Sequence, residues 1–445
     1  MNPPQNTVAF GAPGIEPRWT SSAKEGVGTA YHTSCRVWFT LSHGIVNEIY
    51  YPHVDKPNTR DFQFLISDGE TFCHEEKRDL NHQIEYPERD CLFYRLTNSD
   101  PDGRYRVVKH VLTDPHLSVL LVHTRLEVFD ESLHGKLRLY ALLAPHLAGF
   151  GAGNSAWCSE LGDNELLRAQ REDVHLVMAC NTGFCRRSVG YVGFSDGWQD
   201  LMQNFKMDWE FAAATDGNIA LTGEIDLPDS GEFTIAVAFG RSYESAATKL
   251  FQSLASAFES HHAAYVRQWQ RAVVDRKFDF STDTCDDGGM YRLSRCVLLA
   301  HEDKVFQGAM VASMSIPWGE TKGDQDLGGY PGQVCSCQRP LRPAQEGDQR
   351  VAVVAQAVGQ AAEHHAGHVL RVRVAGQRGD DGFGVGRGEH ATADAEQRQA
   401  AEPLRLVRGQ PQQHVRAGRE ADGVYWLAAL DGRGHVGLYL GIVLC

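Results

Sequence analysis

The sequence predicts a mainly β protein: a large antiparallel sandwich, then a linker helix, the start of a helical domain and an irregular tail. Three observations support this order. Strand-forming runs fill the first part of the chain, apolar residues recur at helical spacing from about residue 242, and the composition changes after Tyr330. Many strands without intervening helices are typical of antiparallel sandwiches rather than parallel sheets.

The predicted strands are rich in β-branched and aromatic residues, and several alternate apolar and polar residues with a period of two. They cover residues 36–41, 62–66, 106–112, 118–129, 136–143, 189–194, 219–227 and 233–239. Asp68 and Gly69 lie between two apolar runs, which indicates a hairpin. We therefore assign residues 1–241 to the sandwich domain.

A linker helix is predicted within residues 242–280, because apolar side chains recur there at steps of three and four residues. The members of this stripe are Ala247, Phe251, Leu254, Phe258, Tyr265 and Trp269. His261 and His262 lie in the same segment, and we interpret them as a solvated helix face rather than a ligand site. A further helix is predicted over residues 290–302, at the start of a domain that covers residues 281–330.

Residues 331–445 differ from the rest of the chain. They contain no Lys, Asn or Met, and large apolar residues are sparse until Tyr425. Such a segment buries too little surface to offset the entropy of ordering, so we expect an aberrant, disordered tail. A natural tail is one interpretation. The one we favour is a GC-rich gene translated in the wrong frame, or an unrelated fused segment.

Composition narrows the classes of protein. The chain has 445 residues, 42% hydrophobic residues and a formal net charge of −14, which suits a globular protein and disfavours nucleic acid as a partner.

No basic and apolar leader precedes the first strands, and no apolar run is long enough to cross a membrane, so we expect a cytoplasmic protein. The 11 scattered Cys residues predict free thiols, and we predict neither a metal site nor a cofactor.

Several long strings resemble glycoside hydrolase family 15, the glucoamylases and glucodextranases of bacteria and archaea. They occur in the family's order and the resemblance covers about residues 8–330. The strings are GAPGIEPRWT (11–20), KEGVGTA (24–30), VWFTLSHG (37–44), NEIYYP (47–52), HEEKRDL (74–80), AHEDK (300–304) and SIPWGE (315–320).

The resemblance implies a fold and an activity. These enzymes have an N-terminal super-β-sandwich, a helical linker and an (α/α)6 barrel that holds the active site, and only the start of that barrel would be present here. They are inverting, exo-acting hydrolases that release glucose from the ends of α-glucans without a cofactor. The implied partner is therefore an α-glucan or oligosaccharide.

The resemblance also suggests substrate-binding residues. The family continues Gly-Gly-Tyr-His-Leu-Val-Trp-x-Arg-Asp, whereas here Gly328-Gly329-Tyr330 is followed by Pro331, so the Trp, Arg and Asp are missing. Tyr330 matches a tyrosine that lines the terminal glucose subsite, and Trp318 is a second candidate for lining the cleft. An ordinary half-buried aromatic at Tyr330, and a core or domain contact at Trp318, remain open.

No catalytic residue is assigned. Hydrolysis by inversion needs an acid and a base roughly 6.5–9.5 Å apart, and the family's two glutamates would lie beyond the point of departure. Glu320, Asp324 and Asp326 cluster in a Gly-containing loop, where we interpret them as solvated charges rather than an acid/base pair. Two alternatives to a hydrolase lineage stay open: a non-catalytic, carbohydrate-associated sandwich fragment and a relative of the glycoside phosphorylases.

Overall fold

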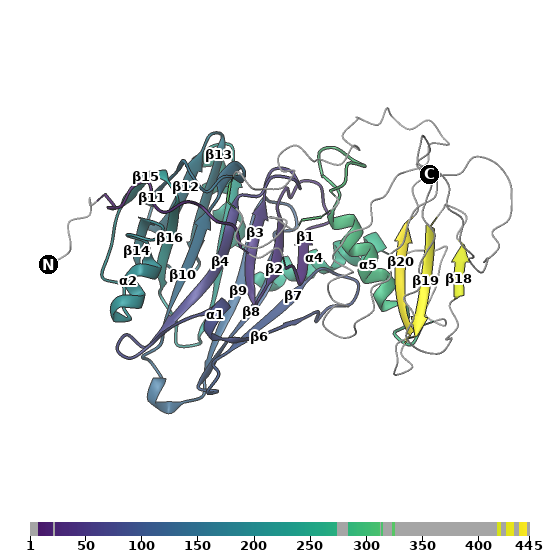
Figure 1. Cartoon of the computed structure of the whole chain (residues 1–445), viewed down its shortest axis with the longest axis horizontal. Coiled ribbons are helices and arrows are strands. Elements are labelled where there is room, and N and C mark those ends of the chain that lie inside the picture. The colour runs from purple at the N-terminus through teal and green to yellow at the C-terminus, as the bar shows by residue number, and fades with distance from the viewer. Residues whose placement is uncertain are drawn as a thin grey trace, which may run out of the picture. The chain divides into compact units, whose positions relative to one another are not determined.

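Two large antiparallel sheets dominate the computed structural model (Figure 1). The structure describes residues 8–20, 23–273, 284–311, 313–314, 323–324, 416–419, 424–430 and 436–442. These residues fall into two units, and the first holds both large sheets together with the helices that pack on them. The mainly β sandwich expected from the strand pattern is therefore confirmed, whereas the start of an (α/α)6 barrel stays a prediction.

The first sheet has eight strands in the order β1-β2-β3-β4-β10-β16-β14, with β5 paired to β4. Their bounds are β1 Gly26–Thr29, β2 Trp38–Ser42, β3 Ile45–Tyr50, β4 Thr59–Ser67, β5 Cys73–Glu75, β10 Arg138–Pro145, β14 Phe184–Tyr191 and β16 Ile219–Ile225. Ser67 of β4 pairs with Cys73 of β5, so the hairpin predicted at Asp68 and Gly69 is confirmed.

The second sheet has nine strands in the order β15-β11-β12-β13-β17-β9-β8-β7-β6. Their bounds are β6 Asn81–Glu85, β7 Tyr94–Ser99, β8 Tyr105–Thr113, β9 Val119–Val128, β11 Asn154–Leu161, β12 Asn164–Arg171, β13 Val174–Cys180, β15 Ala213–Gly217 and β17 Glu232–Gly240. The strand pattern in the sequence does not predict the meander β11-β12-β13, in which polar and charged residues interrupt the apolar runs of β11 and β12.

Alternation along the central strands of the eight-stranded sheet sorts side chains between two apolar clusters. In β4, Phe62, Phe64 and Ile66 enter the main core, whereas Leu65 points to the other face. That other face holds a smaller cluster, which includes Leu201 of helix α2 (Gly197–Asn204). The period of two that predicts the strands therefore also decides which face is covered by the second sheet and which by a helix.

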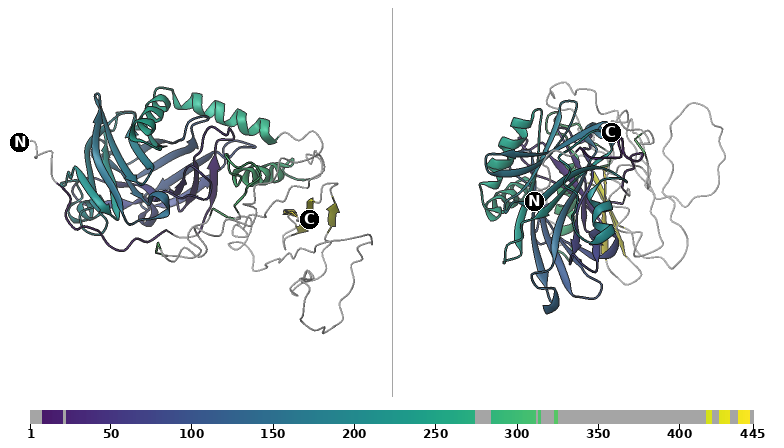
Figure 2. Two further views of the ribbon diagram at one scale, coloured as in Figure 1. Left: turned by 90° about the horizontal axis from the view of Figure 1, so that it is seen from above. Right: turned by 90° about the vertical axis from the view of Figure 1, so that its left-hand side faces the viewer.

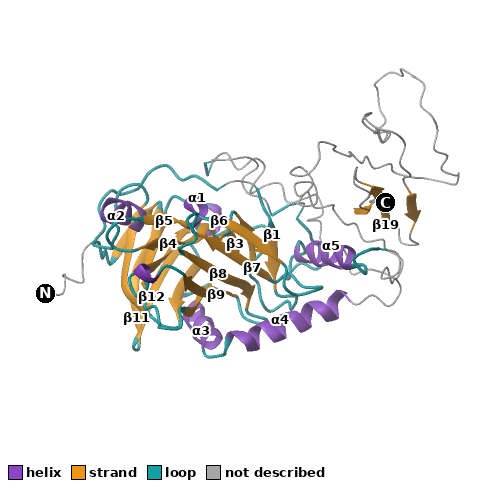
Figure 3. Cartoon of the chain, turned by 90° about the horizontal axis from the view of Figure 1, so that it is seen from below, coloured by secondary structure: helices purple, strands orange, loops and turns teal. Residues whose placement is uncertain are grey.

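Helices α3 (Tyr243–Leu254) and α4 (Phe258–Val273) run along the nine-stranded sheet (Figures 2 and 3). The Ser242 side chain accepts a hydrogen bond from the backbone N–H of Ser245 and so caps α3. The single apolar stripe predicted for this segment is therefore divided between two helices. The solvated interpretation of His261 and His262 is wrong, because both rings are partly buried against the sandwich.

The structure contains two further helices, α1 and α5. The short α1 (Glu76–Asp79) lies between β5 and β6, and α5 (Gly289–Ala300) confirms the helix predicted over residues 290–302. In the part of the chain that the structure describes, no helix is both long and apolar enough to span a membrane.

The second unit contains a three-stranded antiparallel sheet, β18 (Arg416–Arg419), β19 (Val424–Leu430) and β20 (Val436–Ile442). These strands are the described part of the segment that the composition predicts to be an irregular tail. These strands coincide with the stretch from Tyr425 onward, where large apolar residues return and β-propensity is high.

Candidate functional site

The residues predicted to bind substrate, Tyr330 and Trp318, lie outside the described residues, and so do Glu320 and Asp326. Of the loop carboxylates singled out in the sequence, only Asp324 is described. Just before this loop, the segment after α5 packs on the sandwich. We call residues 300–314 the junction segment.

The junction segment folds back on itself directly after α5. The backbone N–H of Asp303 donates to the carbonyl of Ala309 at 2.8 Å, and Val311 donates to the carbonyl of His301 at 3.1 Å. His301 is 2% exposed and its Nδ1 lies 2.8 Å from the Val297 carbonyl in α5. These contacts hold the segment as a short loop that presents Asp303 and Lys304 to the sandwich.

Lys304 attaches this loop to the first hairpin of the sandwich. Its Nζ donates to the Thr29 hydroxyl and to the carbonyls of Ala30 and Cys35, the last two at 2.6 Å each. The same nitrogen lies 4.8 Å from the centroid of the Trp38 ring, within cation–π range. Burial lowers the pKa of Lys304 to about 8, opposed by the charges of Cys35 and Asp303.

Asp303 makes a second attachment beside it. Its carboxylate accepts hydrogen bonds from the backbone N–H groups of Val54 at 3.2 Å, Val305 at 2.8 Å and Phe306 at 2.9 Å. The carboxylate also lies 3.1 Å from His53 Nδ1, and the His53 ring stacks on Phe306. The loop therefore meets the sandwich through two adjacent side chains of opposite charge.

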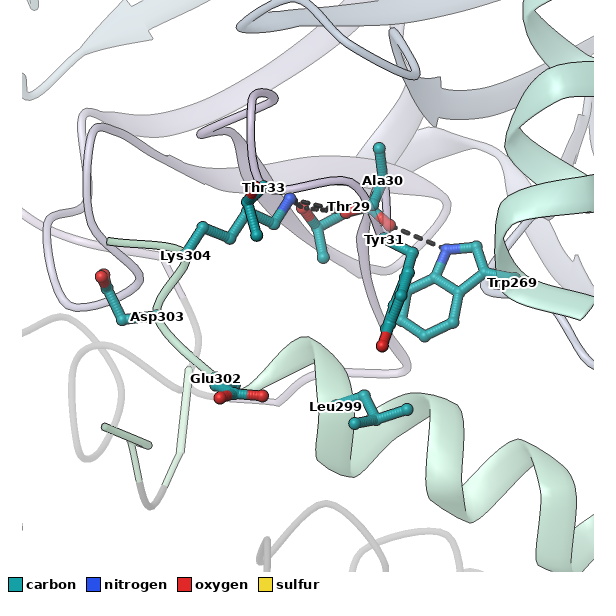
Figure 4. A pocket seen from close by; sticks show the side chains of 9 residues that line it. All are labelled: Thr29, Ala30, Tyr31, Thr33, Trp269, Leu299, Glu302, Asp303 and Lys304. Carbon is teal, nitrogen blue, oxygen red and sulfur yellow. Dashed lines mark hydrogen bonds between the residues drawn. The ribbon is translucent and has the colours of Figure 1, made fainter. Parts of the chain in front are cut away.

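A small pocket of about 40 Å³ lies at this contact (Figure 4). Its lining comprises Thr29, Ala30, Tyr31, Thr33, Trp269, Leu299, Glu302, Asp303 and Lys304. Lys304 reaches from the junction segment to Thr29, and Trp269 of α4 donates from Nε1 to the Thr29 carbonyl at 2.9 Å. The volume is far below the roughly 300–1,000 Å³ of ligand pockets, so this arrangement suits attachment rather than substrate binding.

Asp324 is also attached to the sandwich. Its carboxylate accepts hydrogen bonds from Gly151 N–H at 3.0 and 3.1 Å and from Ala152 N–H at 3.1 Å. The solvated interpretation of this carboxylate is therefore wrong. Backbone donors hold it in place, which is a positioning arrangement and gives no sign of a catalytic acid/base pair.

Buried ion pairs account for charges within the strings that resemble the hydrolases. Lys24 Nζ lies 3.2 Å from Glu48 Oε2, and Lys109 Nζ lies 2.7 Å from Glu76 Oε2. Burial lowers the pKa of Lys24 and raises that of Glu48. Buried charges of this kind need a partner, so these residues are internal structure of the sandwich.

Lys304 lies within the string AHEDK, but the resemblance assigns it no role. A lysine just after an apolar helix is an ambiguous signal, since its partners come from residues 29–35. Among the described residues, no group of three or more His, Cys, Asp or Glu side chains is arranged to hold a metal ion.

The two sheets and the buried polar contacts define a β-sandwich domain on which the segment after α5 is packed. Comparison with known proteins identifies which kind. The family model described as glucodextranase, domain N, matches residues 9–272, and the chain belongs to this family.

Two relatives extend the match beyond that domain. A glucoamylase of Clostridium sp. (strain G0005) is 34% identical over 326 residues, which cover 73% of this chain and 45% of the relative. The solved structure of a bacterial glucoamylase complexed with acarbose is 33% identical with a TM-score of 0.69, over 73% of this chain and 47% of that one. The resemblance to glucoamylases and glucodextranases is thereby confirmed. The chain spans less than half the length of each relative.

Proposed function

We propose that this chain is the front part of an exo-acting, inverting glucan α-glucosidase of the glucoamylase–glucodextranase type. The family match to residues 9–272 and the two glucoamylase relatives support this lineage. Release of glucose from the ends of α-glucans is the activity of the whole protein, and its partner is an α-glucan or oligosaccharide. They belong to the proposal because the chain covers less than half of those relatives.

Within that lineage, the role of the described residues is to form a platform that fixes the first segment of the catalytic domain. The observation that carries this proposal is Lys304, whose ammonium group is enclosed by oxygen atoms of Thr29, Ala30 and Cys35. Asp303 and Asp324 add two further attachments on either side of residues 315–322. Asp324, a few positions before Tyr330, is therefore held against the sandwich.

The chain itself is proposed to lack hydrolytic activity. Cleavage of a glycosidic bond by inversion needs two carboxyl groups on opposite sides of the bond. The sequence departs from the family pattern at Pro331, before the region where the family's glutamates would occur. Asp324 is occupied by backbone donors, which argues against its use as one member of such a pair.

The test is an assay of glucose release from maltose and maltotetraose by the purified full chain, with an intact glucoamylase as positive control. No turnover above the buffer blank is expected. Turnover that disappears in a Glu320→Gln variant would contradict the proposal. Release of glucose 1-phosphate that requires inorganic phosphate would instead favour a phosphorylase.

A separate test reads the nucleotide sequence after the Tyr330 codon, to establish where the residues after Tyr330 come from. Translation in the other two frames is expected to give His-Leu-Val-Trp-x-Arg-Asp if the departure is a frameshift. A well-covered read without that string in any frame would overturn this explanation.

A further inference from the structure

Five aromatic rings form a row between the nine-stranded sheet and helix α4. We call Phe93, His110, His123, Phe258 and His262 the histidine row. The centroids of Phe93 and His110 are 5.6 Å apart at 11°, those of His110 and His123 6.3 Å at 15°, and those of His123 and Phe258 4.7 Å at 19°. His110 and His123 are directly opposite each other on β8 and β9.

Helix α4 contacts this row at both ends. Phe258 stacks on His123, and His262 lies against Phe93 with centroids 4.3 Å apart. These two residues are four apart in the helix and therefore lie on one face. The first turn and a half of α4 is thus docked on the sandwich through a row in which three of the five rings are histidines.

The charges around the row are unevenly distributed. His123 faces Glu232 of β17 and Glu259 of α4, and its Nδ1 lies 3.0 Å from the Thr234 hydroxyl. His262 faces Glu88 at 3.3 Å, and the adjacent His261 lies 3.3 Å from Asp114. Carboxylates therefore offset a positive charge on each of these histidines.

His110 has the opposite surroundings. The groups that act on its charge are His123, Arg95 on the neighbouring strand, and His262, all of which are cationic or can become so. Burial, together with the charges of these three neighbours, lowers the pKa of His110 to about 4. Burial also lowers the pKa of His123, although Glu232 and Glu259 oppose that effect.

We propose that the histidine row makes the docking of α4 pH-sensitive, with the helix docked while His110 and His123 are neutral and released as they become protonated. A charged imidazole at position 110 would lie between an arginine and a second histidine in a partly dry contact, where repulsion is weakly screened. Release of α4 removes the stacking partner of His123 and gives both rings access to water.

Trp269 connects helix α4 to the platform, the part of the sandwich that holds the junction segment. This residue is three turns further along α4 and donates to the Thr29 carbonyl beside Lys304. Undocking of α4 therefore opens one wall of the pocket in which the junction segment is attached. The inference rests on the proposed platform role, but its test does not, because helix opening is measured without any glucan.

Hydrogen exchange of α4 amides in the full chain tests the proposal between pH 7 and pH 5, with correction for the intrinsic pH dependence of exchange. A group that binds a proton only in the undocked state changes the opening equilibrium by up to about ten-fold per pH unit. We expect opening of α4 to rise about ten-fold or more, while amides of the central strand β10 keep their protection.

The decisive variant is His110→Phe, which keeps a ring in the row but cannot be protonated. Opening of its α4 is expected to depend less on pH than in the unmodified chain, because only His123 of the two groups remains. His134→Phe, at an exposed loop position, should behave as the unmodified chain does. The proposal is overturned if the unmodified chain shows no pH dependence or if His110→Phe keeps the same dependence. Should His110→Phe not fold, His110→Gln serves instead, and an NMR titration of His110 with a midpoint at or above about 6.5 overturns the proposal.

Discussion

Trp269 and Lys304 both donate hydrogen bonds to the same residue, Thr29, the last residue of strand β1. Trp269 Nε1 reaches its carbonyl at 2.9 Å, and Lys304 Nζ reaches its hydroxyl. One strand end thereby receives both the linker helix and the segment that follows α5. Because the two contacts share a residue, a change in either one is expected to affect the other.

Replacing Lys304 by methionine tests the attachment of the junction segment. Met retains much of the apolar stem but leaves the Ala30 and Cys35 carbonyls without their donor, which is expected to lower the free energy of unfolding by about 1–3 kcal/mol. Urea denaturation measures the loss, and proteolysis should cut residues 301–311 sooner. Lys136→Met, at an exposed position, is the matched control. Equal stability of both variants would contradict the role of Lys304.

The contribution of Lys304 to stability should also depend on alkaline pH. Burial lowers its pKa from 10.5 to about 8. Between these values the unfolded chain binds more protons than the folded one, so the contribution of Lys304 rises as the pH rises through this window. We expect the difference in unfolding free energy between the unmodified chain and Lys304→Met to grow by about 1 kcal/mol per pH unit from pH 8 to pH 10.5. A difference that stays constant or falls over that range would refute it.

The buried pair of Lys109 and Glu76 should show strong coupling. The Lys109 side chain is 2% exposed and that of Glu76 is fully buried, where it also accepts hydrogen bonds from Phe64 N–H and Asn98 Nδ2. Lys109→Met leaves a buried carboxylate without its cation and is expected to cost about 3–5 kcal/mol. Adding Glu76→Gln should recover part of that loss, which a double-mutant cycle in urea measures.

A control for this pair lies on the same strand. Arg106 pairs with Glu127 across β8 and β9, but both side chains are partly exposed. Arg106→Met is therefore expected to cost less than about 1 kcal/mol. Similar losses of unfolding free energy in Arg106→Met and Lys109→Met would show that burial does not set the strength of the pair between Lys109 and Glu76.

The sequence predicts the architecture well where apolar periodicity is regular. Strands β4, β8, β9 and β17 coincide with predicted runs because their apolar residues fill the core between the sheets. Local periodicity does not reveal the division between α3 and α4. The apolar stripe continues across it, while tertiary contacts such as Phe258 on His123 fix where the second helix begins.

The contacts of the candidate site are harder to predict from the sequence. Asp303 and Lys304 interact with residues 29–54, some 250 positions earlier in the chain, and no local pattern encodes such pairs. Family resemblance identifies the string that contains them but leaves their role unassigned. Tyr330 and Trp318, which the resemblance suggests for substrate binding, stay predictions because they lie outside the described residues.

Substitution of Gly151 by alanine tests the second attachment of the loop. An added Cβ would lie 2.5 Å from Pro17 Cβ and 2.6 Å from His146 Nε2, so the backbone that donates to Asp324 must shift. We expect a loss of about 1–3 kcal/mol in unfolding free energy and faster exchange of the Gly153–Ser155 amides. Ala152→Ser is the matched control, because it keeps the second donor to Asp324 and adds a hydroxyl at an exposed position. If Gly151→Ala is as stable as Ala152→Ser, the backbone there yields without cost and does not hold Asp324 in a fixed position.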